Sequence, residues 1–277
     1  MNSKVRPLLY LILGAPGSDR RAVLADLIAD GLDEGEKALT FLNRNEAPGT
    51  SDQLLGETRP WQWLDGTIAA EVPESISDAS GDAPPEERYS HVFFIAEGAR
   101  NPVDQIEAIK AWITPLDVEF ARIITVINCT LASQHRELVP WWDACVHFSD
   151  VVLLSRRQGV PNKWMSDFQE RYRTKFMPAL FELVKEGRVR NPALILEPQA
   201  RRMTQVFDRE DNDWDTARRL APEAEIEFEV DDEADEENDG RKDSEEDGPV
   251  TEAYFERRAN GSRVIELPDI GKYLGSA

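Results

Sequence analysis

The chain has 277 residues, enough for one large domain or two small ones, and 41% of them are hydrophobic, which suits a globular core. Cys129 and Cys145 are too few for a disulfide framework, and no apolar run is long enough to cross a membrane, so we predict a cytoplasmic protein. The net charge of −21 argues against binding to nucleic acid, because phosphates would be repelled.

Strand and helix signals alternate along the first 185 residues. Short apolar runs predict strands at residues 8–13, 38–42, 91–96, 121–127 and 151–154. Longer segments predict helices at residues 22–28, 102–113, 131–148 with a break near Pro140, and 164–185 with a bend at Pro178. This alternation is typical of an α/β domain whose mostly parallel sheet is covered by helices on both faces.

The last third of the chain differs in composition. Residues 208–247 hold 20 Asp or Glu against 5 Lys or Arg, and such a segment cannot bury enough apolar surface to offset its ordering entropy. We therefore predict an α/β domain at 1–190, a connecting segment at 191–207, an acidic disordered linker at 208–248 and a tail at 249–277. Short strands are predicted at 193–196 and 262–267, and a mobile loop at 73–88.

The first predicted strand runs directly into a glycine-containing turn and then a helix. This order is the setting of a phosphate-binding loop, G-x-x-x-x-G-K-[ST], and the chain has GAPGSDRR at residues 14–21. Gly14 matches the first glycine, and Gly17 and Ser18 lie within the loop. The last three positions hold Asp19, Arg20 and Arg21 in place of glycine, lysine and a hydroxyl residue.

Each of these three residues weakens phosphate binding. An Asp19 carboxylate about 4 Å from a phosphate charge costs on the order of 4 kcal/mol at an effective dielectric of 20, roughly a thousandfold in affinity. Arg20 keeps a positive charge but carries a planar fork where lysine carries a compact ammonium. Arg21 lacks the hydroxyl that would hold Mg²⁺. The plain alternative is an ordinary strand-to-helix turn with Asp19 near the N-cap.

Four later segments complete a recognisable order. They are FLNRNE at 41–46, GTIAA at 66–70, IAEGARNP at 95–102 and SDVVLLSRRQ at 149–158. Over about residues 8–185, the phosphate loop and these segments resemble the CobW-type metallochaperone GTPases, so the chain is identified as a degenerate member of that P-loop family. The resemblance implies a P-loop NTPase-like sheet.

The resemblance also implies which functions are altered. The family's C-x-C-C metal motif falls at residues 67–70, where all three cysteines are absent. In its Walker B region Gly98 is kept, but the acidic residue is displaced to Glu97. The guanine-reading asparagine, lysine and aspartate correspond to Ser155, Arg156 and Gln158. Phosphate, magnesium, guanine and metal positions are thus all changed, while the apolar strands between them remain.

We therefore hypothesise a non-catalytic GTPase-like protein that acts as a binding or regulatory partner, with a CobW-type GTPase as one candidate partner. No catalytic residue, metal ligand or cofactor is expected, and any cofactor would be a nucleotide with Mg²⁺. The candidate binding residues are Gly14, Gly17, Ser18, Asp19, Arg20, Arg21, Glu97, Gly98, Ser155, Arg156 and Gln158. Two alternatives stay open: an active GTP- or ATP-binding protein, a nucleoside triphosphatase with an atypical loop, and an α/β protein that binds an anion or small molecule.

Other chemistry finds little support. The three histidines, His91, His135 and His147, do not have a metal-ligand spacing, and Cys145 and His147 would diverge on a helix. The tryptophans at 61, 63, 141 and 142 are assigned chiefly to core packing, with an interface as the alternative. The arginine pairs at 20–21 and 156–157 are expected at one rim of the sheet, where they would hold an anion or the chain's own acidic linker.

Overall fold

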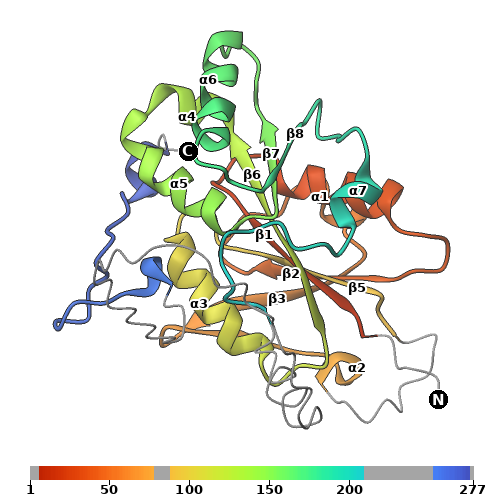
Figure 1. Cartoon of the computed structure of the whole chain (residues 1–277). Helices are drawn as coiled ribbons and strands as arrows, with labels where there is room; N and C mark the ends of the chain where they lie inside the picture. The colour runs from red at the N-terminus through yellow and green to blue at the C-terminus, as the bar shows by residue number, and fades with distance from the viewer. Residues whose placement is uncertain (1–5, 78–87, 209–251, 275–277) are drawn as a thin grey trace, which may run out of the picture. The chain divides into compact units, whose positions relative to one another are not determined.

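The computed structural model describes residues 6–77, 88–208 and 252–274, and its centre is one eight-stranded sheet (Figure 1). The strand order is β4-β3-β2-β5-β1-β6-β7-β8, and all neighbouring strands are parallel except the antiparallel pair β3–β4. The strands are β1 (Leu8–Leu13), β2 (Ala38–Asn43), β3 (Glu57–Leu64), β4 (Thr67–Ala70), β5 (His91–Ile95), β6 (Glu119–Asn128), β7 (Val151–Ser155) and β8 (Leu180–Leu183).

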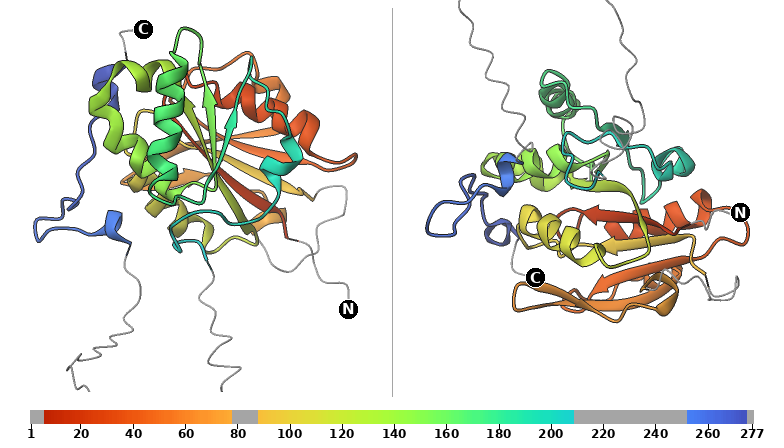
Figure 2. Two further views of the ribbon diagram at one scale, coloured as in Figure 1. Left: turned by 45° about the horizontal axis from the view of Figure 1, so that its top comes forward. Right: turned by 60° about the horizontal axis from the view of Figure 1, so that its bottom comes forward.

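Helices cover both faces of the sheet, as predicted (Figure 2). Side chains of α1 and α7 share a buried apolar cluster with one face of β1, β5, β6 and β7. The helices α4, α5 and α6 pack on the other face, where Trp112 of α3 also contacts Phe94 of β5. The helices are α1 (Arg20–Gly31), α2 (Glu74–Ser77), α3 (Pro102–Ile113), α4 (Cys129–Gln134), α5 (Val139–Phe148), α6 (Asn162–Arg173) and α7 (Pro192–Leu196). The arrangement is P-loop NTPase-like, with a loop joining the central strand β1 to α1.

The five predicted apolar strands are all present, because strands buried on both faces read as continuous apolar runs. Helix α3 spans the predicted residues 102–113, with Asn101 as its N-cap: the Asn101 side chain accepts a hydrogen bond from the Val103 N–H at 2.9 Å. Helix α1 is longer than its predicted core of 22–28. None of the described helices has the length and apolarity that a membrane crossing requires.

The helix predicted at 164–185 is wrong in its second half. Helix α6 ends at Arg173, and the chain turns through Phe176, whose φ of 54° is left-handed. Pro178 disfavours helical backbone in the residue before it, and the apolar run that follows pairs with β7 as the edge strand β8.

Three shorter predictions also need correction. The helix predicted at 131–148 is interrupted at His135, so that α4 and α5 are separate and Pro140 lies in the first turn of α5. Residues 193–196 are part of α7, because the Asn191 side chain caps a helix there at the Leu194 N–H. Residues 262–267 form no strand; Arg263 takes part only in an isolated bridge with Arg257.

The hairpin β3–β4 was not predicted. Its strands are rich in exposed and polar residues, and Pro60 lies within β3. β4 pairs with β3 only from Trp61 onward. On that side of β3, Pro60 therefore has no strand opposite it that would need the N–H that proline lacks. Asp65 and Gly66, both with positive φ, form the turn.

Two predicted loops lie partly beyond the described residues. The loop at 73–88 begins with α2, and its residues 78–87 are outside the description. The acidic linker at 208–248 is described only at Asp208. The domain boundaries remain predictions.

The tryptophans are mainly core residues. Trp61, Trp141 and Trp142 are at most 2% exposed, and the Trp61 indole N–H donates to the Ile95 carbonyl at 3.0 Å. Trp63 is only half-buried and lines a cavity described below.

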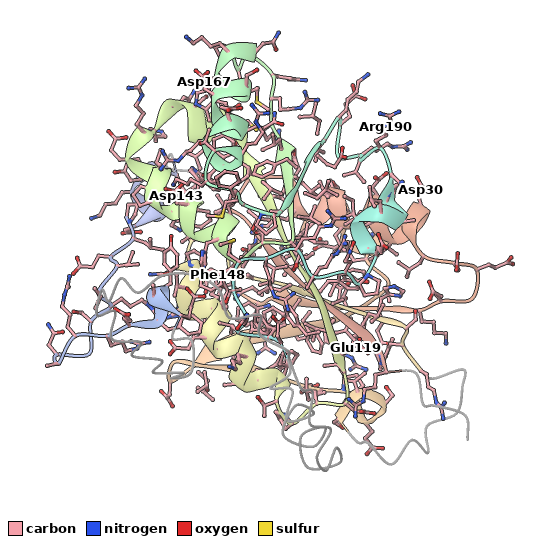
Figure 3. All side chains as sticks on the ribbon, viewed as in Figure 1. Asp30, Glu119, Asp143, Phe148, Asp167 and Arg190 are labelled. Atoms are coloured by element: carbon pink, nitrogen blue, oxygen red, sulfur yellow. The ribbon has the colours of Figure 1, made fainter. Side chains whose placement is uncertain are left out.

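The segment 252–274 packs back onto α5 and α3. His147 on α5 lies with its Nε2 2.9 Å from a carboxylate oxygen of Glu252. Tyr254 and Phe255 add ring contacts with Phe148, which Figure 3 labels. This polar pair and the aromatic cluster therefore hold the start of the segment to α5, and ion pairs of Arg257 and Arg263 hold it to α3.

Glu252 gives this attachment a defined pH dependence. Burial would raise the pKa of its carboxyl group, but hydrogen bonds from His147 and its neighbours outweigh burial and hold the pKa below 4.5. The stabilisation is therefore complete above the unfolded-state pKa and is lost as the pH falls through the lower, folded-state value.

We expect Glu252→Gln to lower the free energy of unfolding by about 1.5 kcal/mol at pH 7. The difference from wild type should disappear when urea unfolding is repeated well below pH 4.5. Glu256→Gln changes an exposed carboxylate of the same segment and should have no effect. A difference that persists at low pH would show that the ionised carboxylate is not its source.

Candidate functional site

The candidate site lies at the rim formed by the carboxyl ends of the parallel strands. The loop 14–19 follows β1, and the loops after β2, β5 and β7 end beside it because these strands run in one direction. This rim is where ligands bind in open α/β sheets. The position of the loop is thus the one that its sequence predicts.

Gly14 and Gly17 allow the loop its path. Gly14 has a φ of 141°, and a Cβ added there would lie 2.4 Å from the Val126 carbonyl oxygen of β6. Gly17 has a φ of 72°. These conformations are unfavourable for residues with a side chain, so both glycines are required by the backbone itself. Ser18 is 1% exposed, and its buried hydroxyl has no hydrogen-bond partner among the described residues.

Asp19 occupies the N-cap position of α1 but does not cap it. Its φ of 67° is left-handed, and its side chain makes no hydrogen bond to the first turn. Instead the carboxylate accepts from the Ser155 hydroxyl at 2.9 Å and pairs with the Arg156 guanidinium at 2.5 Å. Two predicted site segments, the loop and the end of β7, are therefore joined by an ion pair.

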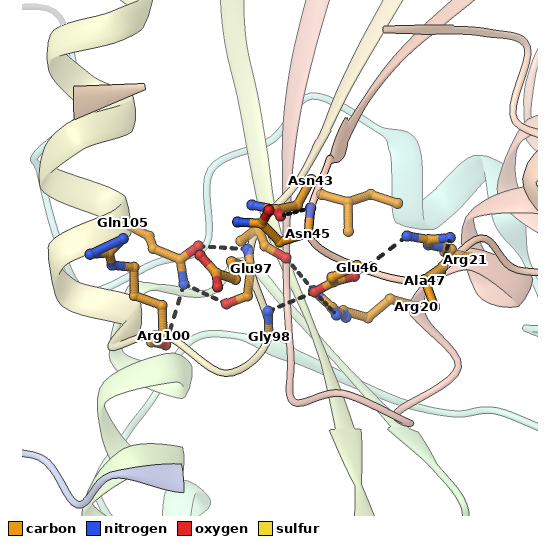
Figure 4. Close-up of polar contacts among 12 residues, drawn as sticks. Arg20, Arg21, Asn43, Asn45, Glu46, Ala47, Glu97, Gly98, Arg100 and Gln105 are labelled. Carbon is orange, nitrogen blue, oxygen red and sulfur yellow. Dashed lines mark hydrogen bonds and ion pairs between the residues drawn. The ribbon is translucent and has the colours of Figure 1, made fainter. Parts of the chain in front are cut away.

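Arg20 is directed into the protein. Only 6% of it is exposed, and its guanidinium donates to the Ala96 carbonyl and, at 2.8 Å, to Glu46 (Figure 4). The same Glu46 oxygen accepts from the Gly98 N–H at 2.9 Å. Glu46 thus joins the loop after β2 to the phosphate-loop region and to the loop after β5.

Gly98 lies where the loop after β5 meets the phosphate loop. A Cβ at this position would lie 2.7 Å from the Arg20 guanidinium and 2.7 Å from the Pro16 nitrogen. Only glycine lets the loop after β5 come this near to the phosphate loop.

Arg21 is also paired. Its guanidinium donates to Asp52 at 2.7 Å and to the Ala47 carbonyl at 2.9 Å, and it lies 3.6 Å from Glu46. A hollow of about 480 Å³ lies over these residues, between the phosphate loop and residues 46–51.

The charges of the ion pairs that the described residues form at this hollow balance. Three carboxylates belong to Asp19, Glu46 and Asp52, and three guanidiniums belong to Arg20, Arg21 and Arg156. Each arginine is in an ion pair with at least one of these carboxylates.

Glu97 and Gln105 order the loop after β5. The buried Gln105 amide accepts from the Glu97 N–H at 2.6 Å and donates to the Glu97 and Arg100 carbonyls at 2.9 and 3.3 Å (Figure 4). The Glu97 carboxylate has no hydrogen-bond partner in the described part of the chain and is half-buried.

The structure does not bring Gln158 to the loop. It is exposed in the turn after β7, whereas Ser155 and Arg156 reach Asp19. Three further residues, Glu46, Asp52 and Gln105, belong to the site but were not predicted. Glu46 ends the family-like segment at residues 41–46 and follows a parallel strand, and these were the signals for it; the sequence alone does not show which loop carboxylates turn toward the arginines.

No cluster that suits a metal is found among the described residues. No three of the His, Cys, Asp and Glu side chains there are grouped as ligands. Cys129 and Cys145 are free and buried, and burial raises the pKa of the Cys129 thiol to about 12. A thiol with such a pKa is not a ready nucleophile at neutral pH.

Comparisons with known proteins add a fold likeness. No family model matches the chain, and no curated protein does. Among solved structures, a zinc-bound triple mutant of the YjiA GTPase shares 14% identity over 76% of this chain and 70% of its own, with a TM-score of 0.42. The zinc-bound YjiA GTPase from E. coli shares 12% identity over 73% and 67%, with a TM-score of 0.40. The likeness says nothing about activity, and the mostly parallel α/β architecture is established by the chain's own strand order.

Proposed function

We propose that this chain is a non-catalytic, GTPase-like member of the CobW type that serves as a binding or regulatory partner of another protein. The observation that carries the proposal is that Arg20 is buried and already hydrogen-bonded within the protein. At the position where a phosphate loop has its lysine, Arg20 is buried and committed to Glu46 and to the Ala96 carbonyl. A cation held in this way is not available to a phosphate group.

The balance of charge supports the same conclusion. A nucleoside triphosphate is a polyanion, and a site that binds it offers an excess of positive charge. Here three carboxylates offset three arginines among the ion-paired residues around the loop that the structure describes. A nucleotide would have to break these ion pairs and to approach the carboxylate of Asp19, which lies at the N-terminus of α1.

The groups for magnesium and guanine are also missing. Arg21 has no hydroxyl for a metal ion and is paired with Asp52. Ser155 donates to Asp19, and Gln158 is exposed and lacks the carboxylate that would accept from guanine. The site thus lacks the groups that would recognise guanine, and it lacks the metal-binding and cationic groups that stabilise the transition state of phosphoryl transfer. The activity left to the fold is binding, and a CobW-type GTPase is the partner whose own fold resembles it.

Titration calorimetry tests the proposal directly. GTP, GDP and ATP, each with and without Mg²⁺, should give no binding to the wild-type protein at about 1 mM ligand. Asp19→Gly removes the carboxylate at a position whose φ of 67° suits glycine, so the fold should be kept. We expect it to raise phosphate affinity less than the roughly thousandfold that charge alone allows, because Arg20 stays occupied.

Asp65→Gly is the matched control. It removes an aspartate with a φ of 49° from the exposed β3–β4 turn, remote from the loop. Micromolar, magnesium-dependent nucleotide binding by the wild type would overturn the proposal and favour an active enzyme. Binding of inorganic phosphate without any nucleotide preference would favour an anion-binding protein instead. If neither binds, the partner is sought by affinity capture.

A further inference from the structure

A second cavity, of about 550 Å³, lies between the β3–β4 hairpin, α3 and the C-terminal segment. It shares no residue with the hollow over the phosphate loop. Its apolar walls are supplied by Trp63, Ile68, Ala108, Ala111 and Trp112. Small-molecule sites are commonly cavities of about 300–1,000 Å³ with apolar walls and a few polar groups, so the size and the lining suit a small organic ligand.

The carboxylates at this cavity are already neutralised. Asp104 pairs with Arg263 at 2.6 Å, and Glu107 pairs with Arg263 at 2.7 Å and with Arg257 at 2.6 Å. These pairs also tie the C-terminal segment to α3. The two acidic side chains therefore do not set the net charge that a ligand meets.

Arg100 provides the remaining charge. Its guanidinium carbon lies 4.1 Å from the centre of the Trp63 ring, and it has no carboxylate partner in the described part of the chain. Stacking uses the face of the guanidinium and leaves its N–H edge open for in-plane hydrogen bonds. A planar carboxylate is the group that matches such an edge with two parallel hydrogen bonds.

We propose that this cavity binds a small aromatic carboxylate, with its ring against the tryptophan walls and its carboxylate on Arg100. The aromatic part of the ligand is buried by Trp63 and Trp112, while a single charge-assisted contact orients it. This site is separate from the proposed partner-binding function, and it requires no nucleotide.

Two isosteric probes separate charge from ring stacking. Calorimetry with 2-naphthoate should give a Kd below about 1 mM, and the uncharged 2-naphthamide should bind at least about tenfold more weakly. The indole N–H signals of Trp63 and Trp112 in ¹H–¹⁵N spectra should shift with 2-naphthoate, which locates the site.

Two variants test the residues. Arg100→Gln should weaken 2-naphthoate about tenfold and abolish its advantage over 2-naphthamide. Ala111→Leu, at an exposed helical position that lines the cavity, should fill space and weaken both probes without harming the fold. Arg190→Gln is the control, since Arg190 is exposed beside α7 and well away from α3 (Figure 3).

The proposal is overturned if neither probe binds at about 5 mM, if both bind equally well, or if the preference survives in Arg100→Gln. Shifts confined to other indoles, or unchanged affinity in Ala111→Leu, would also place the ligand elsewhere.

Discussion

Replacing Arg20 with methionine is expected to lower the free energy of unfolding by about 3 kcal/mol, because breaking a mostly buried ion pair leaves one charge uncompensated. Arg20 is 6% exposed and Glu46 20% exposed at the side chain, so Glu46 would keep its charge in a site that water reaches poorly. The Ala96 carbonyl would lose its donor as well. Urea unfolding measures the loss.

A double variant separates this explanation from simple loss of packing. In Arg20→Met/Glu46→Gln both charges are gone, so most of the stability should return, and the coupling energy should be about 1–3 kcal/mol. If Arg20→Met is as stable as wild type, the guanidinium is not a structural group. A gain of nucleotide binding in Glu46→Gln alone would show that the pair is what blocks the loop.

Replacing Asp150 with asparagine is expected to cost about 3 kcal/mol or more, because it breaks a buried ion pair. Asp150 is fully buried and accepts from the Ile123 N–H at 2.7 Å and the Arg201 N–H at 2.6 Å. The Arg202 guanidinium lies 3.2 Å from it, with 3% of its side chain exposed. An asparagine could accept only one of these two backbone N–H bonds, because the other end of its side chain is an NH₂ group, which donates.

Thermal unfolding measures this effect. For a chain of this size about 3 kcal/mol corresponds to a fall of roughly 6–12 °C in Tm. Asp167→Asn, which changes an exposed residue of α6 labelled in Figure 3, should leave Tm unchanged. A fall of less than about 2 °C in Asp150→Asn would mean that the buried carboxylate contributes little.

Asp150 and Arg20 were both placed from the sequence, whereas their partners were not. Asp150 was predicted at the start of β7 by its place in a family-like segment, but the side chain serves to tie residues 201–202 to the sheet. Arg20 was predicted in a degenerate phosphate loop between a strand and a helix, and in the structure it is the first residue of α1. Its partner Glu46 is 26 residues away, and only the parallel arrangement of β1 and β2 around β5 brings the two together.

The errors have the same origin. Residues 180–183 read as the end of a helix because their apolar content fits either state, and it is pairing with β7 that makes them a strand. The β3–β4 hairpin was missed because only Trp61 of its residues is buried and Pro60 lies within β3, so no continuous apolar run marked these strands.

The sequence by itself determined the α/β class, the five apolar strands, α3 and the place of the loop, because apolar periodicity and glycine turns are local properties of the chain. It also places Asp19, Arg20 and Arg21 at the positions where the phosphate-loop pattern has glycine, lysine and a hydroxyl residue. Only the tertiary structure decided that both Arg20 and Arg21 are paired with carboxylates and that Arg100 has no carboxylate partner among the described residues. Pairing depends on the distances between side chains of different loops, and those distances exist only once the parallel strands have set their ends side by side.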